Sequence, residues 1–354
     1  MDTQMKLLEK LTNLPGISGY EKPVRDAMKE EFNALGINVS YDNIGSIIGE
    51  HGNHGPKIAI SGHMDEIGML VTKITEDGFL KFQTIGGWWA NVMLAQQYDV
   101  HSTNGKVYRA VMGSKPPHML EGEERSRAFP VDQMYFDLGV KNKEEVLALG
   151  IKPGCPVTPA IQFQTMANPD YLLAKAFDNR AGCGVAIEVM RNVLNCEHPN
   201  TLYSIGSVQE EVGCRGARTA AQKIQPDVVF ALDVTISSDT PGTKGSAVMG
   251  KGPAILLYDS SLIGHEGLRK FVCKVADELQ IPYQIDYLSR GGTDAGAMHV
   301  TNVGAPAMAL CIPSRYIHSH TSMISYSDYL NTIKLLTEVV KRLDDKAYQE
   351  ILNY

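Results

Sequence analysis

The sequence predicts an α/β protein whose mostly parallel sheet is covered by helices on both faces and interrupted by a small β-rich domain. Apolar strand-like runs alternate with helical segments at the start of the chain and again from about residue 167, which is the rhythm of parallel α/β folds. Between these parts, short alternating segments are separated by turn signals. The length of 354 residues is enough for about two domains.

The first 66 residues begin the predicted α/β domain. "MDTQMKLLEKL" starts an amphipathic helix, and residues 45–51 and 57–63 are predicted strands. The second strand is a continuous apolar run, typical of a strand buried on both faces. A helix is predicted over residues 21–35 because apolar side chains recur there at helical spacing, namely Val24, Met28, Phe32 and Leu35.

Residues 67–166 are the predicted insertion. Alternating strand segments come in pairs here, and Asn104-Gly105 between two of them is a strong hairpin signal. Residues 142–150 predict a short helix closed by a glycine. Residues 113–130 are polar, charged and contain proline and glycine, so we expect a mobile loop there.

The α/β rhythm returns after the insertion. We therefore expect residues 1–66 and 167–354 to form one discontinuous domain, with residues 67–166 as a separate small domain. The later helices are predicted over residues 180–194, 216–224 and 266–279 and from about Tyr326, and the strands over residues 201–209, 227–234, 282–288 and 306–312.

The composition excludes several classes of protein. The net charge of −7 argues against a nucleic-acid surface, and no apolar run reaches the roughly 18 residues that a membrane helix needs. The N-terminus lacks the continuous apolar segment of a signal peptide, and the six cysteines are scattered without a C-x-x-C pair. We expect a cytoplasmic protein with reduced thiols and with neither nucleic acid nor membrane as a partner.

Acids and histidines follow five predicted strands. Sites in open α/β sheets gather at the carboxyl ends of the strands, so we expect these side chains to meet. In chain order they are His63, Asp178, the pair Glu210 and Glu211, Asp233, and the pair His318 and His320.

This mixture of imidazoles and carboxylates predicts a two-metal site. Such ligands suit zinc, cobalt or manganese, and two neighbouring ions need one carboxylate to bridge them. In one workable assignment Asp178 bridges, His63 and Asp233 hold one ion, and Glu211 and His318 hold the other. Each residue alone has an ordinary explanation, such as a helix N-cap or a solvated strand end. Their coincidence at five strand ends favours a metal hydrolase, and the residue pattern alone predicts no more.

Six motifs also resemble a known family. They are "SGHMDEIG", "AFDNRAG", "QEEVGCRGA", "ALDV", "GGTDA" and "RYIHSH". Each motif alone is weak, but together they fall in the order found in the cytosolic metallo-aminopeptidases that include glutamyl aminopeptidase and the tetrahedral aminopeptidases. The resemblance covers nearly the whole chain, including the insertion.

The resemblance implies a three-layer α/β/α zinc-peptidase domain with an inserted β-barrel or PDZ-like dimerisation domain, often in a hollow homododecamer built from dimers. It also implies a cis peptide bond after Asp178, and it selects His318 over His320 as a ligand. Glu210 carries over as the general base and Asp65 as the catalytic residue that orients His63. The metal ligands that carry over are His63, Asp178, Glu211, Asp233 and His318.

The implied function is an aminopeptidase that uses two divalent metal ions per subunit, with zinc best suited and cobalt or manganese as alternatives. Glu210 would take a proton from the activated water and pass it to the leaving amine. The substrates would be short peptides with a free N-terminus. A preference for acidic first residues is implied only by the family name. Lys244, Arg290 and Arg315 lie in nearby segments, and each is also typical of solvated surface.

Three other functions fit parts of this pattern. A deacylase or another two-metal hydrolase would use the same ligands. A glycoside hydrolase would use a carboxylate pair but has no need of two histidines, and Trp88 and Trp89, the only tryptophans, both lie in the insertion. A non-enzymatic metal-binding scaffold would leave Glu210, an acid with no assigned ligand role, unexplained.

Overall fold

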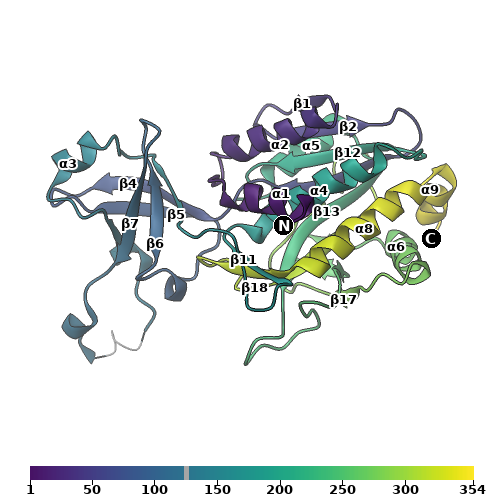
Figure 1. Cartoon of the computed structure of the whole chain (residues 1–354). Helices are drawn as coiled ribbons and strands as arrows, with labels where there is room; N and C mark the ends of the chain where they lie inside the picture. The colour runs from purple at the N-terminus through teal and green to yellow at the C-terminus, as the bar shows by residue number, and fades with distance from the viewer. Residues whose placement is uncertain (123–126) are drawn as a thin grey trace.

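A sheet of 11 strands runs through the larger lobe of the computed structural model, which describes residues 1–122 and 127–354 (Figure 1). Its main path has the strand order β1-β2-β12-β3-β13-β18-β19-β11-β10, and β14 pairs with β17 and β18. The strands are β1 (Val39–Tyr41), β2 (Ile47–His51), β3 (Lys57–His63), β10 (Gln164–Thr165), β11 (Tyr171–Ala174), β12 (Thr201–Ser207), β13 (Val228–Ile236), β14 (Ala254–Leu256), β17 (Gln284–Asp286), β18 (Ala307–Arg315) and β19 (Ser322–Ser325).

The centre of this sheet is parallel, as predicted. β12, β3, β13 and β18 pair in parallel, so their carboxyl ends lie at one edge of the sheet. The outer pairings along the main path are antiparallel. The continuous apolar run of β3 is buried from Ile58 to His63 because helices cover both faces of the sheet.

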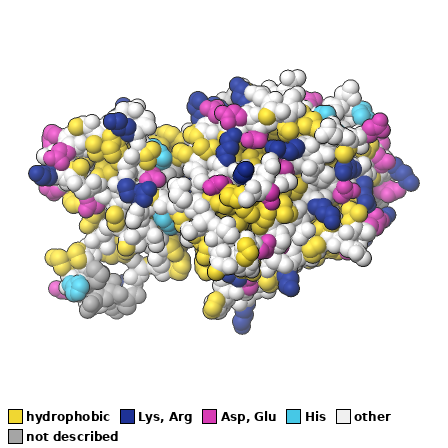
Figure 2. Space-filling model, in the orientation of Figure 1, with side chains coloured by type: hydrophobic (Ala, Val, Ile, Leu, Met, Phe, Trp, Pro, Cys, Tyr) yellow, Lys and Arg dark blue, Asp and Glu magenta, His cyan; other side chains and the backbone are white. Residues whose placement is uncertain are grey.

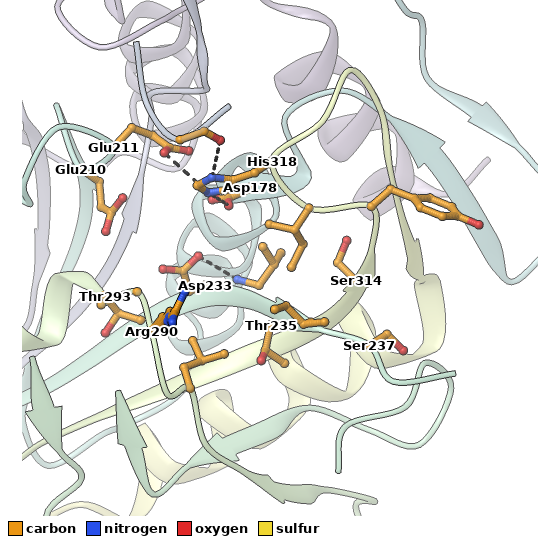
Figure 3. A pocket seen from close by; sticks show the side chains of 18 of the residues that line it. Asp178, Glu210, Glu211, Asp233, Thr235, Ser237, Arg290, Thr293, Ser314 and His318 are labelled. Atoms are coloured by element: carbon orange, nitrogen blue, oxygen red, sulfur yellow. Dashed lines mark hydrogen bonds and ion pairs between the residues drawn. The ribbon is translucent and has the colours of Figure 1, made fainter. Parts of the chain in front are cut away.

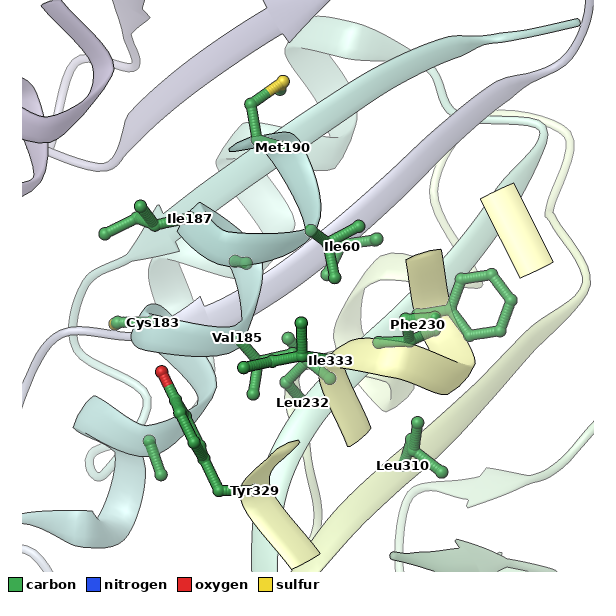
Figure 4. Packing of buried hydrophobic residues seen from close by; sticks show 14 of the residues in the cluster. Ile60, Cys183, Val185, Ile187, Met190, Phe230, Leu232, Leu310, Tyr329 and Ile333 are labelled. Carbon is green, nitrogen blue, oxygen red and sulfur yellow. The ribbon is translucent and has the colours of Figure 1, made fainter. Parts of the chain in front are cut away.

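The two faces of the sheet differ in the size of their side chains. Large residues such as Phe230 and Leu310 meet α4 and α8 on one face (Figure 4). Small residues such as Ala59 and Ala231 meet α5 on the other. The first face is covered by α1 (Thr3–Asn13), α2 (Lys22–Ala34), α4 (Phe177–Val193), α6 (Glu266–Glu278), α8 (Tyr326–Arg342) and α9 (Asp345–Leu352), and the second by α5 (Arg215–Ile224) and α7 (Asp294–Met298).

The smaller lobe is a closed barrel with the strand order β4-β5-β8-β7-β6-β9. Tyr98, Met112 and Phe136 are among the side chains that fill it. The predicted hairpin joins β6 to β7, with Gly105 in the left-handed conformation at a φ of 81°. The strands are β4 (Gly68–Ile74), β5 (Leu80–Ile85), β6 (Gln97–His101), β7 (Val107–Gly113), β8 (Tyr135–Asp137) and β9 (Pro156–Pro159), accompanied by α3 (Lys143–Ala148), η1 (Ala90–Val92), η2 (Pro117–Met119) and η4 (Val131–Gln133).

The structure tests several of the predictions made from the sequence. The α/β/α fold with a β-rich insertion is confirmed, and all six cysteines are free. The C-terminal helix is two helices, because Leu343 and Asp344 interrupt the pattern between α8 and α9. The domain boundaries at 66/67 and 166/167 stay predictions, although β10 already pairs with the main sheet. Residues 123–126 of the predicted loop lie outside the described residues.

Three further observations concern an unpredicted hairpin, the charges on the surface and the lengths of the helices. The short hairpin β15 (Tyr258–Asp259) and β16 (Leu262–Ile263) was not expected from the sequence. Basic and acidic side chains are interspersed over the larger lobe on the face that Figure 2 shows. Among the residues that the structure describes, no helix is long and apolar enough to span a membrane.

Candidate metal centre

The predicted site residues meet at the carboxyl edge of the parallel strands. Six of them line one cavity of about 730 Å³, and Asp65 is fully buried beside it. In Figure 3 the acids and His318 gather at one end of this cavity, while Thr235, Ser237 and Ser314 lie toward the other. The six are His63, Asp178, Glu210, Glu211, Asp233 and His318.

Asp178 lies between the two histidines. Its Oδ1 is 3.0 Å from Nε2 of His63, and its Oδ2 is 3.3 Å from Nε2 of His318. Glu211 Oε2 lies 3.6 Å from the same nitrogen of His318. The peptide bond between Asp178 and Asn179 is cis, as the resemblance implies. One carboxylate therefore faces both imidazoles, the arrangement that a bridging ligand requires.

Nδ1 of each histidine, the ring nitrogen that does not face Asp178, forms a hydrogen bond with a backbone carbonyl oxygen. His63 Nδ1 lies 3.0 Å from the carbonyl oxygen of Asp65, and His318 Nδ1 lies 2.9 Å from that of Gly87. A carbonyl can only accept, so each Nδ1 must carry the proton and donate it. Each Nε2 then presents a lone pair to the acids in the neutral ring, which is the state of a metal-binding histidine.

Asp65 holds the paired glutamates as well as His63. Its two carboxylate oxygens accept the backbone N–H groups of Glu210 at 3.0 Å and Glu211 at 3.1 Å, and the hydroxyl of Ser18 at 2.6 Å. Oδ1 of Asp65 also lies 3.5 Å from Nδ1 of His63. Asp65 thus joins the end of β3 to the loop after β12, and it positions both sides of the cluster.

Burial shifts the acid–base properties of the cluster. It raises the pKa of Glu210 to about 8, against the attraction of His63, and together with the charge of Asp178 it raises the pKa of Glu211 to about 8. Burial works against protonation of His318, but Asp178 and Glu211 outweigh it and raise the pKa of His318 to about 10. Buried carboxylates crowded in this way need cations to stay ionised.

The donor set fits divalent metal ions. Two imidazole nitrogens and several carboxylates are ligands that zinc, cobalt and manganese accept. His63, Glu210 and Asp233 offer ligand atoms within 4.8 Å of one another, as do Asp178, Glu211 and His318. Oε1 of Glu211 is buried without a hydrogen-bond partner among the described residues, which a bound cation would remedy.

Comparison with known proteins identifies the family. A profile of the M42 glutamyl aminopeptidase family matches residues 45–335. The chain belongs to this family. It is a metal-dependent aminopeptidase, so the resemblance and the reaction class predicted from the sequence are confirmed.

Similar proteins cover nearly the full chain. The chain is 33% identical to the glutamyl aminopeptidase of Lactococcus lactis subsp. cremoris, over 99% of this chain and 100% of that one. It is also 33% identical to the lysyl aminopeptidase of Pyrococcus furiosus, over 96% and 97%. A TET aminopeptidase from a marine-sediment Thaumarchaeota archaeon superposes with a TM-score of 0.96 at 39% identity, over 99% and 100%.

A further solved structure bears on assembly. The TET1 peptidase of Pyrococcus horikoshii, described as able to form a tetrahedron or a large octahedral shell, is 31% identical to this chain. It superposes with a TM-score of 0.86 over 96% of this chain and 100% of that one.

Two carboxylates in the aminopeptidase lie at similar distances from Nε2 of His63. Oε2 of Glu210 is 3.7 Å from Nε2 of His63, and Oδ1 of Asp233 is 3.9 Å from it. Distance alone therefore admits either acid as the ligand. Both line the cavity, but their surroundings differ, because Asp233 lies within β13, whereas Glu210 lies in the loop after β12, beside Cys214.

The other candidates have different surroundings. His320 is buried away from the cluster, with its Nε2 2.6 Å from the carbonyl oxygen of Gln97 in the barrel. Arg315 lines the cavity but forms a bidentate ion pair with Asp239, at 2.8 and 2.7 Å. Arg290 also lines the cavity, and it has no ion-pair partner among the described residues. Lys244 is exposed and does not line it.

A buried ionic network behind the site was not predicted. Lys175 Nζ contacts both oxygens of Glu66, at 2.7 and 2.9 Å, and Arg180 lies 3.3 Å from the same carboxylate. Arg180 also donates to the carbonyl of Met64 at 2.6 Å. The network joins the segment of His63 to that of Asp178. Glu66 and Arg180 stand inside two quoted motifs, but nothing in the pattern showed that they pair.

Proposed function

We propose that this aminopeptidase cleaves the first peptide bond with two divalent metal ions per subunit. The observation that carries the proposal is the placement of one carboxylate, Asp178, between the Nε2 atoms of two histidines. Zinc suits the donors best, with cobalt or manganese as alternatives. The proposed ligands are His63 and Asp233 for one ion, Glu211 and His318 for the other, and Asp178 for both.

Glu210 is the proposed general base. Bound cations would polarise the substrate carbonyl and acidify a water molecule. Glu210 accepts the proton of the attacking water and transfers it to the nitrogen of the leaving amine. Without metal ions, burial raises its pKa to about 8, and the nearby cations would lower that pKa again and keep the carboxylate ionised, as a proton acceptor must be. Asp65 holds the backbone of Glu210 and the ring of His63 in place for this transfer.

The carboxylates also explain why the enzyme acts at the N-terminus. A free α-amino group is positively charged at neutral pH and complements the acids of the site, whereas a blocked N-terminus has no such charge. Short peptides with a free N-terminus are therefore the proposed substrates.

We further propose a preference for an acidic first residue. The cavity beyond the metal ligands is lined by hydroxyl side chains such as Thr235 and Thr240 and by Arg290. Because Asp239 neutralises Arg315, Arg290 is the lining arginine, among the residues that the structure describes, that is left to meet a substrate carboxylate. Arg290→Ala should lower kcat/KM for glutamyl substrates about 10-fold or more and leave leucyl substrates within about twofold. Equal losses on both substrates would contradict this role.

Self-association through the barrel is the proposed route to a homododecamer of dimers. The barrel lobe exposes apolar side chains, among them Trp89, Val107, Val111 and Met119, which a partner copy would cover. The assembly described for the TET1 peptidase of Pyrococcus horikoshii supports this proposal. Light scattering on the wild-type chain and on Val107→Asp would test it, because a monomeric wild type would contradict it. The free cysteines support a cytoplasmic location.

One experiment tests the core of the proposal. The protein is dialysed against a chelator, reloaded separately with zinc, cobalt or manganese, and assayed on glutamyl, aspartyl, leucyl and lysyl anilides beside N-blocked controls. Metal content is measured on the same samples. Two ions per chain and cleavage of unblocked substrates only are expected. A single ion at full activity would contradict the two-ion assignment.

A further inference from the structure

We propose that Glu210, Cys214 and Asp294 form an additional site for a soft divalent cation such as zinc or cadmium, and that cation binding there inhibits the enzyme. The inhibition rests on the proposed role of Glu210 as general base, whereas the binding itself does not. None of the five proposed metal ligands takes part in this site.

The three side chains converge although they come from different elements. Glu210 and Cys214 lie in the loop between β12 and α5, and Asp294 begins α7. Each offers one ligand atom within 4.8 Å of the others, and Sγ of Cys214 lies 3.2 Å from Oε1 of Glu210. Glu210 and Cys214 line the main cavity, so a cation can reach the site from solvent.

Asp294 supplies a second and independent indication. Asp294 is 2% exposed, and one carboxylate oxygen, Oδ2, accepts hydrogen bonds from the hydroxyl groups of Ser61 at 2.7 Å and Ser207 at 2.5 Å. The other oxygen, Oδ1, is buried without any partner among the described residues. A buried carboxylate oxygen left unpaired is unfavourable, and a cation held between Asp294, Cys214 and Glu210 would satisfy it.

The donor chemistry selects the kind of cation. A thiolate with two carboxylates suits zinc and cadmium and is unsuited to magnesium or calcium, which prefer oxygen ligands alone. Burial and the charge of Glu210 raise the pKa of the Cys214 thiol, so the thiol keeps its proton until a thiophilic cation displaces it. On binding, a sulfur–metal bond forms, the S–H bond breaks and the proton leaves to solvent. No oxidant or reductant takes part.

The two oxygens of Glu210 connect this site to catalysis. Oε2 lies toward His63, at 3.7 Å from Nε2, and Oε1 lies toward Cys214. A cation bound at Oε1 would withdraw charge from the carboxylate that must accept the proton. The same metal, for example zinc, would then activate the enzyme at low concentration through the catalytic ligands and inhibit it at higher concentration through the additional site.

Cadmium serves as the probe in the test. Cadmium bound by a thiolate gives an ultraviolet charge-transfer band, and the proposed catalytic ligands contain no sulfur, so the band reports only sulfur ligation. Manganese-loaded wild type, Cys214→Ser, Asp294→Asn and the control Cys196→Ser are titrated with cadmium. Cys196 is a partly exposed thiol that does not line the cavity. Thermal unfolding confirms that each variant folds.

The expected band appears in the wild type and in Cys196→Ser, is lost in Cys214→Ser, and needs more cadmium in Asp294→Asn. No band in the wild type, or an equal band in Cys214→Ser, would overturn the site. Cadmium should inhibit the wild type at the concentrations that develop the band and spare Cys214→Ser, and a band without inhibition would overturn the inhibitory role. An enzyme inactive before cadmium is added would instead contradict the proposed function, and the band would still report on the site.

Discussion

The two halves of the proposed metal centre are built in different ways. His63 is 1% exposed, ends a central strand, and receives its orientation from the backbone and carboxylate of Asp65, two residues further along the chain. His318 has a side chain 41% exposed, sits in a loop with a left-handed φ of 55°, and is oriented by Gly87 from the inserted barrel. One half belongs to the core of the sheet, and the other is completed only by the second lobe.

This difference indicates how each half can fail. The His63 half is supported by Asp65 and by the buried network of Glu66, Lys175 and Arg180, so its disruption should also destabilise the fold. The His318 half depends on contacts between two lobes, so it can weaken while the fold remains intact. Mutations that separate loss of metal from loss of stability test this comparison.

The largest effect is expected at the consecutive glutamates. Glu210→Gln removes the proposed base but no proposed ligand, so turnover should fall by about 10²- to 10⁴-fold while both ions stay bound. Glu211→Gln removes a ligand of the His318 half, so one of the two ions should be lost. Metal content and kcat measured on the same samples check both variants. Loss of an ion from Glu210→Gln would make Glu210 a ligand and Asp233 a candidate base.

The buried network should control stability. Glu66→Gln leaves Lys175 and Arg180 without their carboxylate partner in a region shielded from water. Breaking a buried ion pair by removing one partner costs about 3–5 kcal/mol, so the free energy of unfolding should fall by about that amount. Urea denaturation of the metal-free protein measures it, and Glu76→Gln, which removes an exposed ion pair with Lys143, is the control. Comparable losses in both would mean that the buried network contributes no more than an exposed ion pair, and that it gives the His63 half no special support.

Lys175 predicts a pH dependence of the same half. Burial outweighs the attraction of Glu66 and lowers its pKa from 10.5 to about 8. At Lys175 the unfolded chain therefore binds more protons between pH 8 and 10.5, so the contribution of Lys175 to stability, the difference between the wild type and Lys175→Met, should rise with pH across this window, by at most about 3 kcal/mol. Lys175→Met should lack this contribution. Denaturation of both proteins at pH 7.5, 9 and 10 tests the sign, and parallel curves would contradict it.

The sequence predicted which side chains meet at the candidate site better than it predicted the contacts that hold those side chains in place. The acids and histidines were expected to meet because parallel strands end at one edge of the sheet, which fixes His63 and Asp233 relative to each other. Nothing local marks Gly87 as the acceptor of His318, because 231 positions separate them and a carbonyl leaves no trace in residue identity. The pairing of Glu66 with Lys175 depends on packing in the same way. Contacts between distant backbone atoms require the fold itself.

Gly87→Ala tests the dependence on the barrel. An added Cβ would lie 2.8 Å from Nδ1 of His318, so the ring must move away from the Gly87 carbonyl. Loss of the group that orients a metal-binding histidine typically costs 10- to 100-fold in metal affinity. One ion should therefore bind that much more weakly and the other should be unchanged, as measured by competition with a chelator.

A second barrel glycine provides the matched control for Gly87→Ala. A Cβ at Gly113 would lie 2.7 Å from the ring of Tyr135, within the barrel. Gly113→Ala should therefore disturb the barrel comparably while both ions keep their affinity. Equal weakening in both variants would mean that barrel stability in general, and not the Gly87 carbonyl, controls the His318 half.

The smallest effect is expected at His320, which anchors the loop of His318 to the barrel a second time. Its Nε2 donates to the carbonyl of Gln97, and its ring packs edge-on against Tyr98. His320→Leu replaces the imidazole with an apolar side chain that can still pack against the barrel, but it removes this hydrogen bond, worth about 0.5–1.5 kcal/mol. The second ion should then bind up to about 10-fold more weakly, and His320→Gln, which restores a donor, should recover part of the loss. If His320→Leu released the ion as completely as Gly87→Ala, the loop as a whole would be positioning His318, and the single carbonyl would no longer distinguish the two halves.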